Sequence, residues 1–364
     1  MSYFFAPPVK ALALAEPLEQ FDRVWVRYRG RKLIYFGGCD YFRLASHPVI
    51  ARCVVRAIKK EGLLNVAASR VTTGNHPLYE KLEAALRVFF KVDAVLLTST
   101  GYTADLVIAQ ALAGRFSHAI IDERSHSSLK DAAHFLDCPV LEYKHRDARH
   151  AAQTVARCGP HAKIILLTEG VFAQDGTLAP LPELLKALPR DGTLLLDDAH
   201  GAGVLGKNGR GAVEYFGLRD KRIVRAITLS KAFGTYGGAV LGNRKLCQSI
   251  VERSELFAGS TPPPLPLAAA AITALSTVAS DRSLRARLQR NLKLLGRDVP
   301  ILSIAPKTAA EAARIKKRLL AAGIYPSFIR YPNAPASGYF RLAISSEHTP
   351  AQIKRLLEAI GHSQ

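Results

Sequence analysis

One lysine in this sequence lies where an amine could react with an aldehyde. Lys231 follows the apolar run IVRAITLS, where a buried strand is expected to end, in the segment TLSKAFGTYGG. Loss of water around such an amine favours its neutral, nucleophilic form, which can bond to an aldehyde as a Schiff base. A single lysine after a strand is more often an ordinary surface residue, so the prediction needs support from other positions.

A carboxylate and a helix start supply that support. Asp197 ends the apolar run TLLLD, where a carboxylate is costly without a cationic partner. A protonated ring nitrogen would be such a partner, with an attraction of about 5 kcal/mol at an effective dielectric near 20. Thr100, Gly101 and Tyr102 begin a helix after AVLLTS, and a helix N-terminus is suited to a phosphate group. Singly, these residues are equally consistent with a loop cap and a helix cap.

The elements that position these residues follow from the hydrophobic pattern. From Ala94 onward, the apolar runs AVLLTS, HAIID, KIILLTE, TLLLDD and IVRAITLS alternate with helical segments, which predicts a mostly parallel sheet covered by helices. Active sites of such sheets form at the carboxyl ends of the strands. The polar residues found there are Thr100, His126, Asp175, Asp197 with His200, and Lys231. A phosphate site, a strand-end aspartate and a buried lysine in this order describe fold-type I enzymes that use pyridoxal 5'-phosphate (PLP).

We therefore predict an α/β fold with a mostly parallel central sheet and a smaller α/β domain at the C-terminus. Leucines and phenylalanines at helical spacing predict a core-facing helix over 77–90, and Thr349 with Gln352 predicts a capping box before the last helix. The predicted parts are an N-terminal segment 1–44, whose strand near 32–36 packs with the small domain, a large PLP-binding domain 45–282, and the small domain 283–364.

The segment GAGVLG satisfies the GxGxxG spacing of dinucleotide-binding proteins, with Asp220 at a suitable distance. We reject this interpretation because DDAH separates the strand from the glycines. In addition, KNGRG places turn residues where the fingerprint requires a helix.

Composition limits the partners and the compartment. Fifty basic and thirty acidic residues give a net charge of +20. This charge favours binding of polyanions such as coenzyme A or an acidic carrier protein, and it is equally consistent with a solvated basic surface that binds no partner. We expect no nucleic-acid partner, no metal and no membrane span, since the most apolar stretch is short and contains Pro266. Five scattered cysteines and the absence of an export signal predict a cytoplasmic protein.

Nine segments, in order along nearly the whole chain, resemble the α-oxoamine synthases. They are CDYFRLASHP, SRVTTGNHPLYEKLE, STGYTADL, DERSHSSL, TEGVFAQDGTLAPL, LDDAHGAGVLGKNGRG, TLSKAFGTYGGAV, GSTPPP and YFRLAISSEHTPAQI. The resemblance implies a transferase, an acyltransferase that is a homodimer with shared active sites.

The resemblance also implies a role for each matching residue. Lys231 would be the Schiff-base lysine and catalytic base, with Asp197 on the ring nitrogen, His200 near the ring hydroxyl and His126 stacked on the ring. Thr100, Gly101, Tyr102 and Thr228 would lie at the phosphate, joined by Ser260 and Thr261 across the subunit interface. Arg341 would bind the amino-acid carboxylate, and the pocket would be completed by Glu169, Ser69 and Cys39.

The implied reaction is a decarboxylative condensation of L-alanine with an acyl thioester, pimeloyl-CoA, in biotin biosynthesis. Glycine acetyl transfer, serine acylation and condensation with a carrier-linked acyl group stay open as alternatives, and so does a non-catalytic partner subunit. The amino acid, the acyl chain and the choice between coenzyme A and a carrier protein are not fixed by these residues.

Several positions differ from the family pattern. Cys39 replaces an asparagine of the family pattern, and Ala173 replaces a serine. Arg43 replaces a glycine, and Ala67 and Ala68 replace a pair of glycines. The added side chains should narrow the substrate pocket. The sequence also begins late relative to the family, without part of an N-terminal helix and its acyl-contacting arginine.

Overall fold

The computed structural model describes residues 15–330 and 338–361. Its centre is a seven-stranded sheet in the order β4-β10-β9-β8-β7-β5-β6. The strands are β4 (Ala94–Thr98), β5 (His118–Asp122), β6 (Val140–Tyr143), β7 (Ile164–Glu169), β8 (Thr193–Asp197), β9 (Ile223–Thr228) and β10 (Gly238–Gly242). Only β10 runs antiparallel to its neighbours β4 and β9, so the prediction of a mostly parallel sheet is confirmed.

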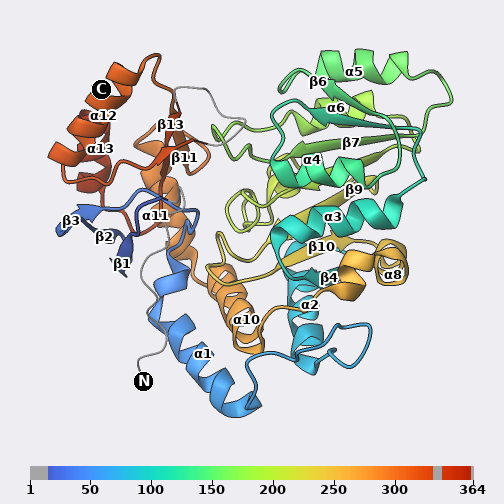
Figure 1. Cartoon of the computed structure of the whole chain (residues 1–364), viewed down its shortest axis with the longest axis horizontal. Helices are drawn as coiled ribbons and strands as arrows, with labels where there is room; N and C mark the ends of the chain where they lie inside the picture. Colours follow the sequence, from blue (N-terminus) through green and yellow to red (C-terminus); the bar gives the residue numbers. More distant parts are fainter. Residues whose placement is uncertain (1–14, 331–337, 362–364) are drawn as a thin grey trace, which may run out of the picture.

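Helices cover both faces of this sheet, as Figure 1 shows. Every residue of β7 is buried, and its side chains alternate between two separate cores. Ile164 and Leu166 face the core that holds α2 and α10, whereas Ile165 and Leu167 face the core that holds α3 and α8. A strand that is apolar on both faces therefore occupies the middle of the sheet.

The helices of this part of the chain have the following bounds. They are the short 3₁₀ turn η1 (Leu44–Ser46), α1 (Pro48–Glu61), α2 (Pro77–Phe90), α3 (Gly101–Leu112), α4 (Ser127–His134), α5 (Ala148–Arg157), α6 (Leu181–Ala187), α7 (Ala212–Tyr215), α8 (Arg244–Arg253), α9 (Glu255–Gly259) and α10 (Leu265–Ser280). The helix predicted over 77–90 is α2, which buries Leu82 and Leu86. The glycines of GAGVLG lie in turns, and the next helix, α7, starts at Ala212, so the rejection of the dinucleotide fingerprint is confirmed.

A second unit is built from the C-terminal part of the chain. Its antiparallel sheet has the order β11-β13-β12, with β11 (Ile301–Ile304), β12 (Phe328–Ile329) and β13 (Tyr339–Ala343). Its helices are α11 (Arg282–Lys293), α12 (Ala309–Ala321) and α13 (Pro350–Ile360). The capping box predicted at the start of the last helix is present, because Gln352 donates its backbone N–H to Thr349 and receives the Thr349 N–H in return.

The N-terminal strands pack against this second unit, on the left of Figure 1. β1 (Glu19–Asp22), β2 (Trp25–Tyr28) and β3 (Arg31–Ile34) form an antiparallel sheet. The Ile34 N–H donates to the Gly323 carbonyl at 2.8 Å, and the Tyr325 N–H donates to the Ile34 carbonyl at 2.9 Å. We propose the division at residues 44 and 282 on the basis of this pairing and of the two sheets.

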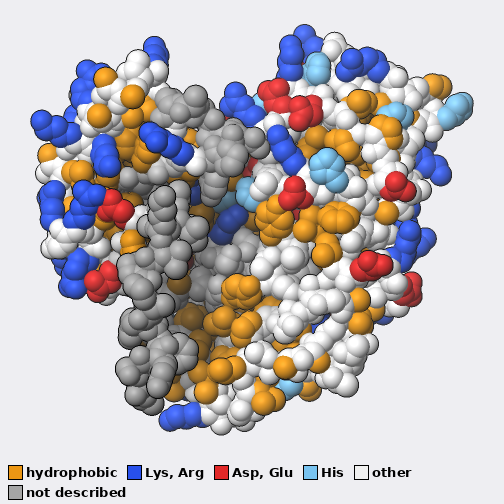
Figure 2. All heavy atoms as spheres, viewed as in Figure 1, with side chains coloured by type: hydrophobic (Ala, Val, Ile, Leu, Met, Phe, Trp, Pro, Cys, Tyr) orange, Lys and Arg blue, Asp and Glu red, His pale blue; other side chains and the backbone are white. Residues whose placement is uncertain are grey.

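Within the described residues, none of the helices combines the length and apolar character that crossing a bilayer requires. Basic side chains are spread over both units of the face in Figure 2 and do not gather in one patch.

Candidate active site

A cavity of about 420 Å³ lies between the carboxyl edge of the central sheet and the C-terminal unit. The sheet contributes Lys231, His126, His200 and Glu169, and the C-terminal unit contributes Arg341. The remaining lining residues are Cys39, Glu123, Arg124, Ser125, Ser127, Lys130, Ala173, Gln174, Ile329 and Tyr339. Figure 2 shows the molecule hollowed between the two units. The volume falls in the range of small-molecule sites.

Lys231 lies in a short turn after β9, in surroundings that are buried. Its neighbours Leu229, Ala232 and Phe233 are at most 1% exposed. The end of the strand is therefore buried, whereas Ser230 is exposed and Lys231 itself is half-buried because the cavity opens beside it, so the amine stays accessible. A nucleophilic amine needs this combination of a dry environment and an open approach.

Asp197 is the last residue of β8, as predicted, and pairs across the sheet with Glu169 of β7. Its Oδ1 accepts the Ala199 N–H at 2.9 Å, while its Oδ2 accepts no hydrogen bond from any residue in the described ranges. Asp197 does not line the cavity surface, whereas Glu169 does. Asp197 is only 8% exposed, and its free oxygen could accept a charge-assisted hydrogen bond from a cationic ligand nitrogen.

Two histidines reach the cavity from different loops. His200 follows β8, and its Nδ1 lies 2.6 Å from the Tyr41 hydroxyl. Complete burial, together with the charge of Lys231, holds the pKa of His200 well below its usual range. Partial loss of water also lowers the pKa of His126, which stays exposed and caps α4 through a hydrogen bond from the Ser128 N–H to its Nδ1. Both rings are therefore neutral at neutral pH and suited to hydrogen bonding and stacking.

Glu169 lines the cavity and holds two other cavity-lining residues through hydrogen bonds. Its carboxylate oxygens accept the backbone N–H groups of His126 and Ala173, each at 2.9 Å. Burial, and then the nearby charge of Asp197, raise the pKa of Glu169 to about 8. Glu169 therefore binds a proton near neutral pH, which limits the negative charge around Asp197.

The helix predicted at Thr100 is α3, and Thr100 caps it in a reciprocal pair with Thr103. A Cβ on Gly101 would lie 2.6 Å from the Thr228 Cβ, so glycine is required here for the approach of the helix to β9. The predicted place of Gly101 beside a phosphate stays a prediction. Tyr102 is 38% exposed and its ring lies edge-on to His126, with the ring centres 6.1 Å apart.

Besides Asp197, seven predicted site residues do not line this cavity, namely Thr100, Gly101, Tyr102 and Thr228 where α3 meets β9, and Ser69, Ser260 and Thr261 elsewhere. Ser69 is in a turn, where its carbonyl accepts from Thr72 and Gly74. The Ser260 hydroxyl donates to the Leu256 carbonyl, and the Thr261 carbonyl accepts from the Ser99 hydroxyl at 2.6 Å. These contacts account for their local positions, and their implied roles at the subunit interface stay predictions.

Arg341 of β13 enters the cavity with its guanidinium already oriented. Its Nε donates to the Ala173 carbonyl at 2.6 Å, and its Nη1 lies 3.3 Å from the Cys39 sulfur. Although burial acts in the other direction, Cys39 and Tyr41 raise the pKa of Arg341. A charged, positioned fork of this kind is suited to a carboxylate.

The departures from the family pattern separate into two groups. Cys39 and Ala173 line the cavity, whereas Arg43, Ala67 and Ala68 do not. Arg43 and Ala67 have positive φ angles of 52° and 49°, a conformation in which glycine is unstrained. The expected narrowing of the pocket by residues 43, 67 and 68 stays a prediction, and two of these three substitutions place strain in the backbone.

Sequence reasoning missed three residues of this region. Tyr41 lies in the segment CDYFRLASHP, which resembles the family but does not by itself give the tyrosine a role. Asp105 is on an apolar helix, where both its carboxyl oxygens are buried without a hydrogen-bond partner. Burial, and then the charge of Asp197, raise the pKa of Asp105 well above its usual range. Arg124 follows β5 by two residues, so the strand-end rule could have found it.

Comparison with known proteins agrees with this geometry. A family model for class I and II aminotransferases matches residues 31–360. The 8-amino-7-oxononanoate synthase of Thioalkalivibrio sulfidiphilus is 36% identical over 349 residues, which are 92% of this chain and 89% of that protein. The 8-amino-7-oxononanoate synthase of Methylobacillus flagellatus is 35% identical over 358 residues, 94% of this chain and 90% of that protein.

Solved structures give the same result. A serine palmitoyltransferase from S. paucimobilis, solved with PLP and myriocin bound, superposes with a TM-score of 0.87 at 27% identity, covering 94% of this chain and 90% of that one. An 8-amino-7-oxononanoate synthase from Francisella tularensis superposes with a TM-score of 0.78 at 27% identity, covering 90% of this chain and 96% of that one. The chain therefore belongs to the class I and II aminotransferase family, as a fold-type I enzyme of the α-oxoamine synthase group.

Proposed function

We propose that this enzyme condenses L-alanine with pimeloyl-CoA, releasing CO₂ and coenzyme A and forming 8-amino-7-oxononanoate. A bond forms between the alanine Cα and the acyl carbonyl carbon, while the acyl C–S bond and the bond from Cα to the carboxylate break. No oxidant or reductant is needed. The observation that carries the proposal is the convergence of Lys231, His126, His200 and Arg341 on one cavity in a chain so similar to synthases of this name.

The residues present fit PLP as the cofactor. Lys231 offers an accessible amine, Asp197 keeps an oxygen free, and Gly101 packs on Thr228 at the N-terminus of α3, where a phosphate would bind. When bound, PLP supplies an electron sink for the charge that develops at Cα. Asp197 would hold the ring nitrogen protonated, His200 would bond the ring hydroxyl, and His126 would stack on the ring.

The protein's own side chains would transfer the protons and orient the amino-acid substrate. The Lys231 amine, once released, removes the proton from the alanine Cα and returns a proton after CO₂ has left. Arg341 holds the alanine carboxylate and is itself held by the Ala173 carbonyl, so the substrate is oriented before reaction. We propose a homodimer in which Ser260 and Thr261 reach the phosphate of the neighbouring subunit.

Two measurements test this function. The purified enzyme with PLP should show the visible absorption of a lysine-bound cofactor, and the Lys231→Ala variant should lose it. Of L-alanine, glycine and L-serine, L-alanine should shift that absorption at the lowest concentration, and product should form with pimeloyl-CoA. A shift with glycine or L-serine alone would replace the substrate assignment, and an unchanged spectrum in Lys231→Ala would refute the lysine assignment.

A further inference from the structure

Two cationic side chains in the cavity wall, Arg124 and Lys130, have no use in the chemistry described above. Arg124 lies between β5 and α4, and it lines the same cavity as Lys231 and Arg341. Its side chain is 53% exposed, and it forms an ion pair with Asp175, whose Oδ2 lies 4.0 Å from Arg124 Nη1, beyond hydrogen-bond distance. Across residues 15–330 and 338–361, the guanidinium donates no hydrogen bond, so its fork of N–H groups is available to a ligand.

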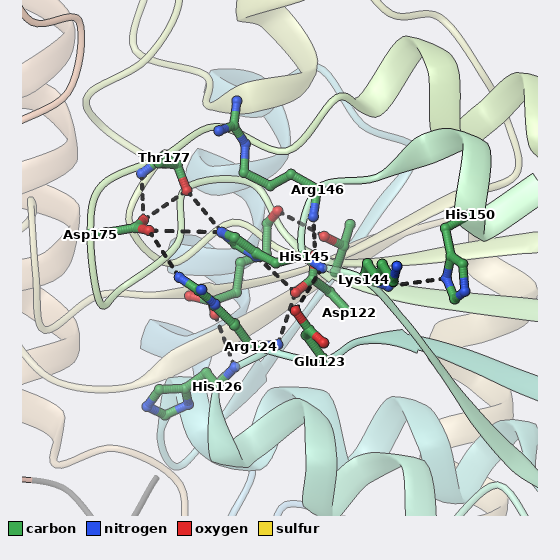
Figure 3. Close-up of polar contacts among 12 residues, drawn as sticks. Asp122, Glu123, Arg124, His126, Lys144, His145, Arg146, His150, Asp175 and Thr177 are labelled. Atoms are coloured by element: carbon green, nitrogen blue, oxygen red, sulfur yellow. Dashed lines mark hydrogen bonds and ion pairs between the residues drawn. The ribbon is translucent and has the colours of Figure 1, made fainter. Parts of the chain in front are cut away.

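A network of fixed polar groups positions Arg124, as Figure 3 shows. Asp122, at the end of β5, accepts the Arg124 N–H at 2.9 Å and the Arg146 N–H at 2.8 Å. The His145 ring lies between two carboxylates, with Nδ1 2.9 Å from Asp122 Oδ1 and Nε2 3.7 Å from Asp175 Oδ2. The guanidinium therefore extends from an anchored backbone beside an anchored carboxylate.

The same network explains why Asp175 does not neutralise Arg124. Asp175 Oδ1 accepts from the Thr177 hydroxyl at 2.7 Å and from the Thr177 N–H at 2.9 Å. Its Oδ2 is shared between His145 at 3.7 Å and Arg124 at 4.0 Å. Asp175 is thus largely paired with its own loop and with His145. Among the described residues, the Arg124 guanidinium therefore has no close ion-pair partner to displace when an anionic ligand binds.

The remaining charges of the cavity point to the kind of ligand. In the proposed function, Lys231 serves the cofactor and Arg341 the alanine carboxylate, so Arg124 and Lys130 are the cavity cations left for the second substrate. Lys130 donates one N–H to the Glu123 carbonyl at 2.9 Å, which keeps it on the same wall as Arg124. A planar guanidinium binds carboxylate or phosphate oxygens with two parallel hydrogen bonds.

We propose that Arg124 binds an anionic group of the acyl donor and so sets the specificity of the enzyme for that substrate. The inference rests on the proposed function, because it needs an acyl thioester as the second substrate. Two groups of such a donor share the required chemistry: the carboxylate at the far end of a dicarboxylic acyl chain, and the phosphates of coenzyme A.

The experiment compares Arg124→Gln with the parent enzyme on three thioesters. Pimeloyl-CoA carries both anionic groups, heptanoyl-CoA lacks the chain carboxylate, and pimeloyl-N-acetylcysteamine lacks the phosphates. We expect KM to rise at least about tenfold for each thioester that carries the group bound by Arg124, as expected for loss of a charge-assisted hydrogen bond. A rise for the two pimeloyl thioesters identifies the carboxylate, and a rise for the two coenzyme A thioesters identifies the phosphates.

Several controls make the result specific. The KM for L-alanine and the alanine-induced spectral shift should not change, since Arg341 carries that site. Arg190→Gln removes an exposed arginine that does not line the cavity, and should leave all three KM values unchanged. Unchanged KM values for Arg124→Gln with every thioester would overturn the inference.

A binding measurement separates the failure of this inference from failure of the proposed function. If the parent enzyme turns over none of the thioesters, the proposed reaction fails, but calorimetry with pimelate and with coenzyme A still tests Arg124. Weaker binding of either anion to Arg124→Gln than to the parent would support the site, and equal binding of both would overturn it.

Discussion

Replacing His145 with glutamine should change how the stability of this enzyme depends on pH. His145 is anchored between Asp122 and Asp175, and its side chain is only 13% exposed. Although burial acts in the other direction, hydrogen bonds to these two carboxylates raise the pKa of His145 to about 9. The matching effect lowers the pKa of Asp175 to about 2, against the influence of its own burial. Both shifts describe one set of contacts, so their energies are not added.

The magnitude follows from proton linkage. The folded protein holds a proton on His145 up to about pH 9, whereas the unfolded chain loses it near 6.5. This difference corresponds to about 3 kcal/mol of stability, present in full below about pH 6. The contribution falls to about half by pH 8 and is nearly gone at pH 10, because the folded state then no longer binds an extra proton.

The assay is denaturant unfolding of the parent and of His145→Gln between pH 6 and pH 10. The difference in unfolding free energy between the two proteins should shrink by about 3 kcal/mol over this range, while any pH-independent cost of the substitution cancels. NMR titration of the His145 ring, assigned by its absence in the variant, gives the folded-state pKa directly. A titration near 6.5, or a stability difference that is flat with pH, would refute the reasoning.

Three further predictions concern the buried and strained positions. Burial, and then the charge of Asp197, raise the pKa of Asp105 in the fold, so ionisation of this group in the unfolded chain lowers stability as the pH rises. Asp105→Asn should therefore raise Tm by about 2 °C or more at pH 8 and by less at pH 4, and thermal melts at both pH values check this. Ala67→Gly should stabilise the fold by about 0.5 to 1 kcal/mol, because glycine adopts the positive φ of residue 67 without strain. Arg43→Gly should instead destabilise the fold, because the Arg43 side chain donates hydrogen bonds to the carbonyls of residues 35 and 37. Denaturant unfolding of both variants measures the two effects. Although burial opposes the effect, Arg341 lowers the pKa of Cys39, whereas burial raises the pKa of Cys247 to about 11. Iodoacetamide at pH 7.5 should therefore alkylate Cys39 several-fold faster than Cys247, and L-alanine should slow the reaction of Cys39. Peptide mass spectrometry measures the rates.

The sequence alone determined the fold class and the chemistry-bearing residues of the central sheet. The apolar runs and the polar residues that follow them place His126, Asp197 and Lys231 at one edge, because parallel strands align their carboxyl ends. The positions of helices are also set by residues close together in the sequence, and the structure confirms the predicted helix α2 and the capping box at Thr349. Such patterns are legible because each depends on neighbours within a few residues.

Only the tertiary structure decided which distant residues meet. Arg341 contacts Cys39 and Ala173 across the cavity, although 302 residues of chain separate the first pair and 168 the second. The isolation of Asp105 and the charge shared by His145 and Asp175 likewise depend on burial and on side-chain distances of a few ångströms. Coulomb and desolvation energies vary steeply with those quantities, and hydrophobic periodicity carries no information about them.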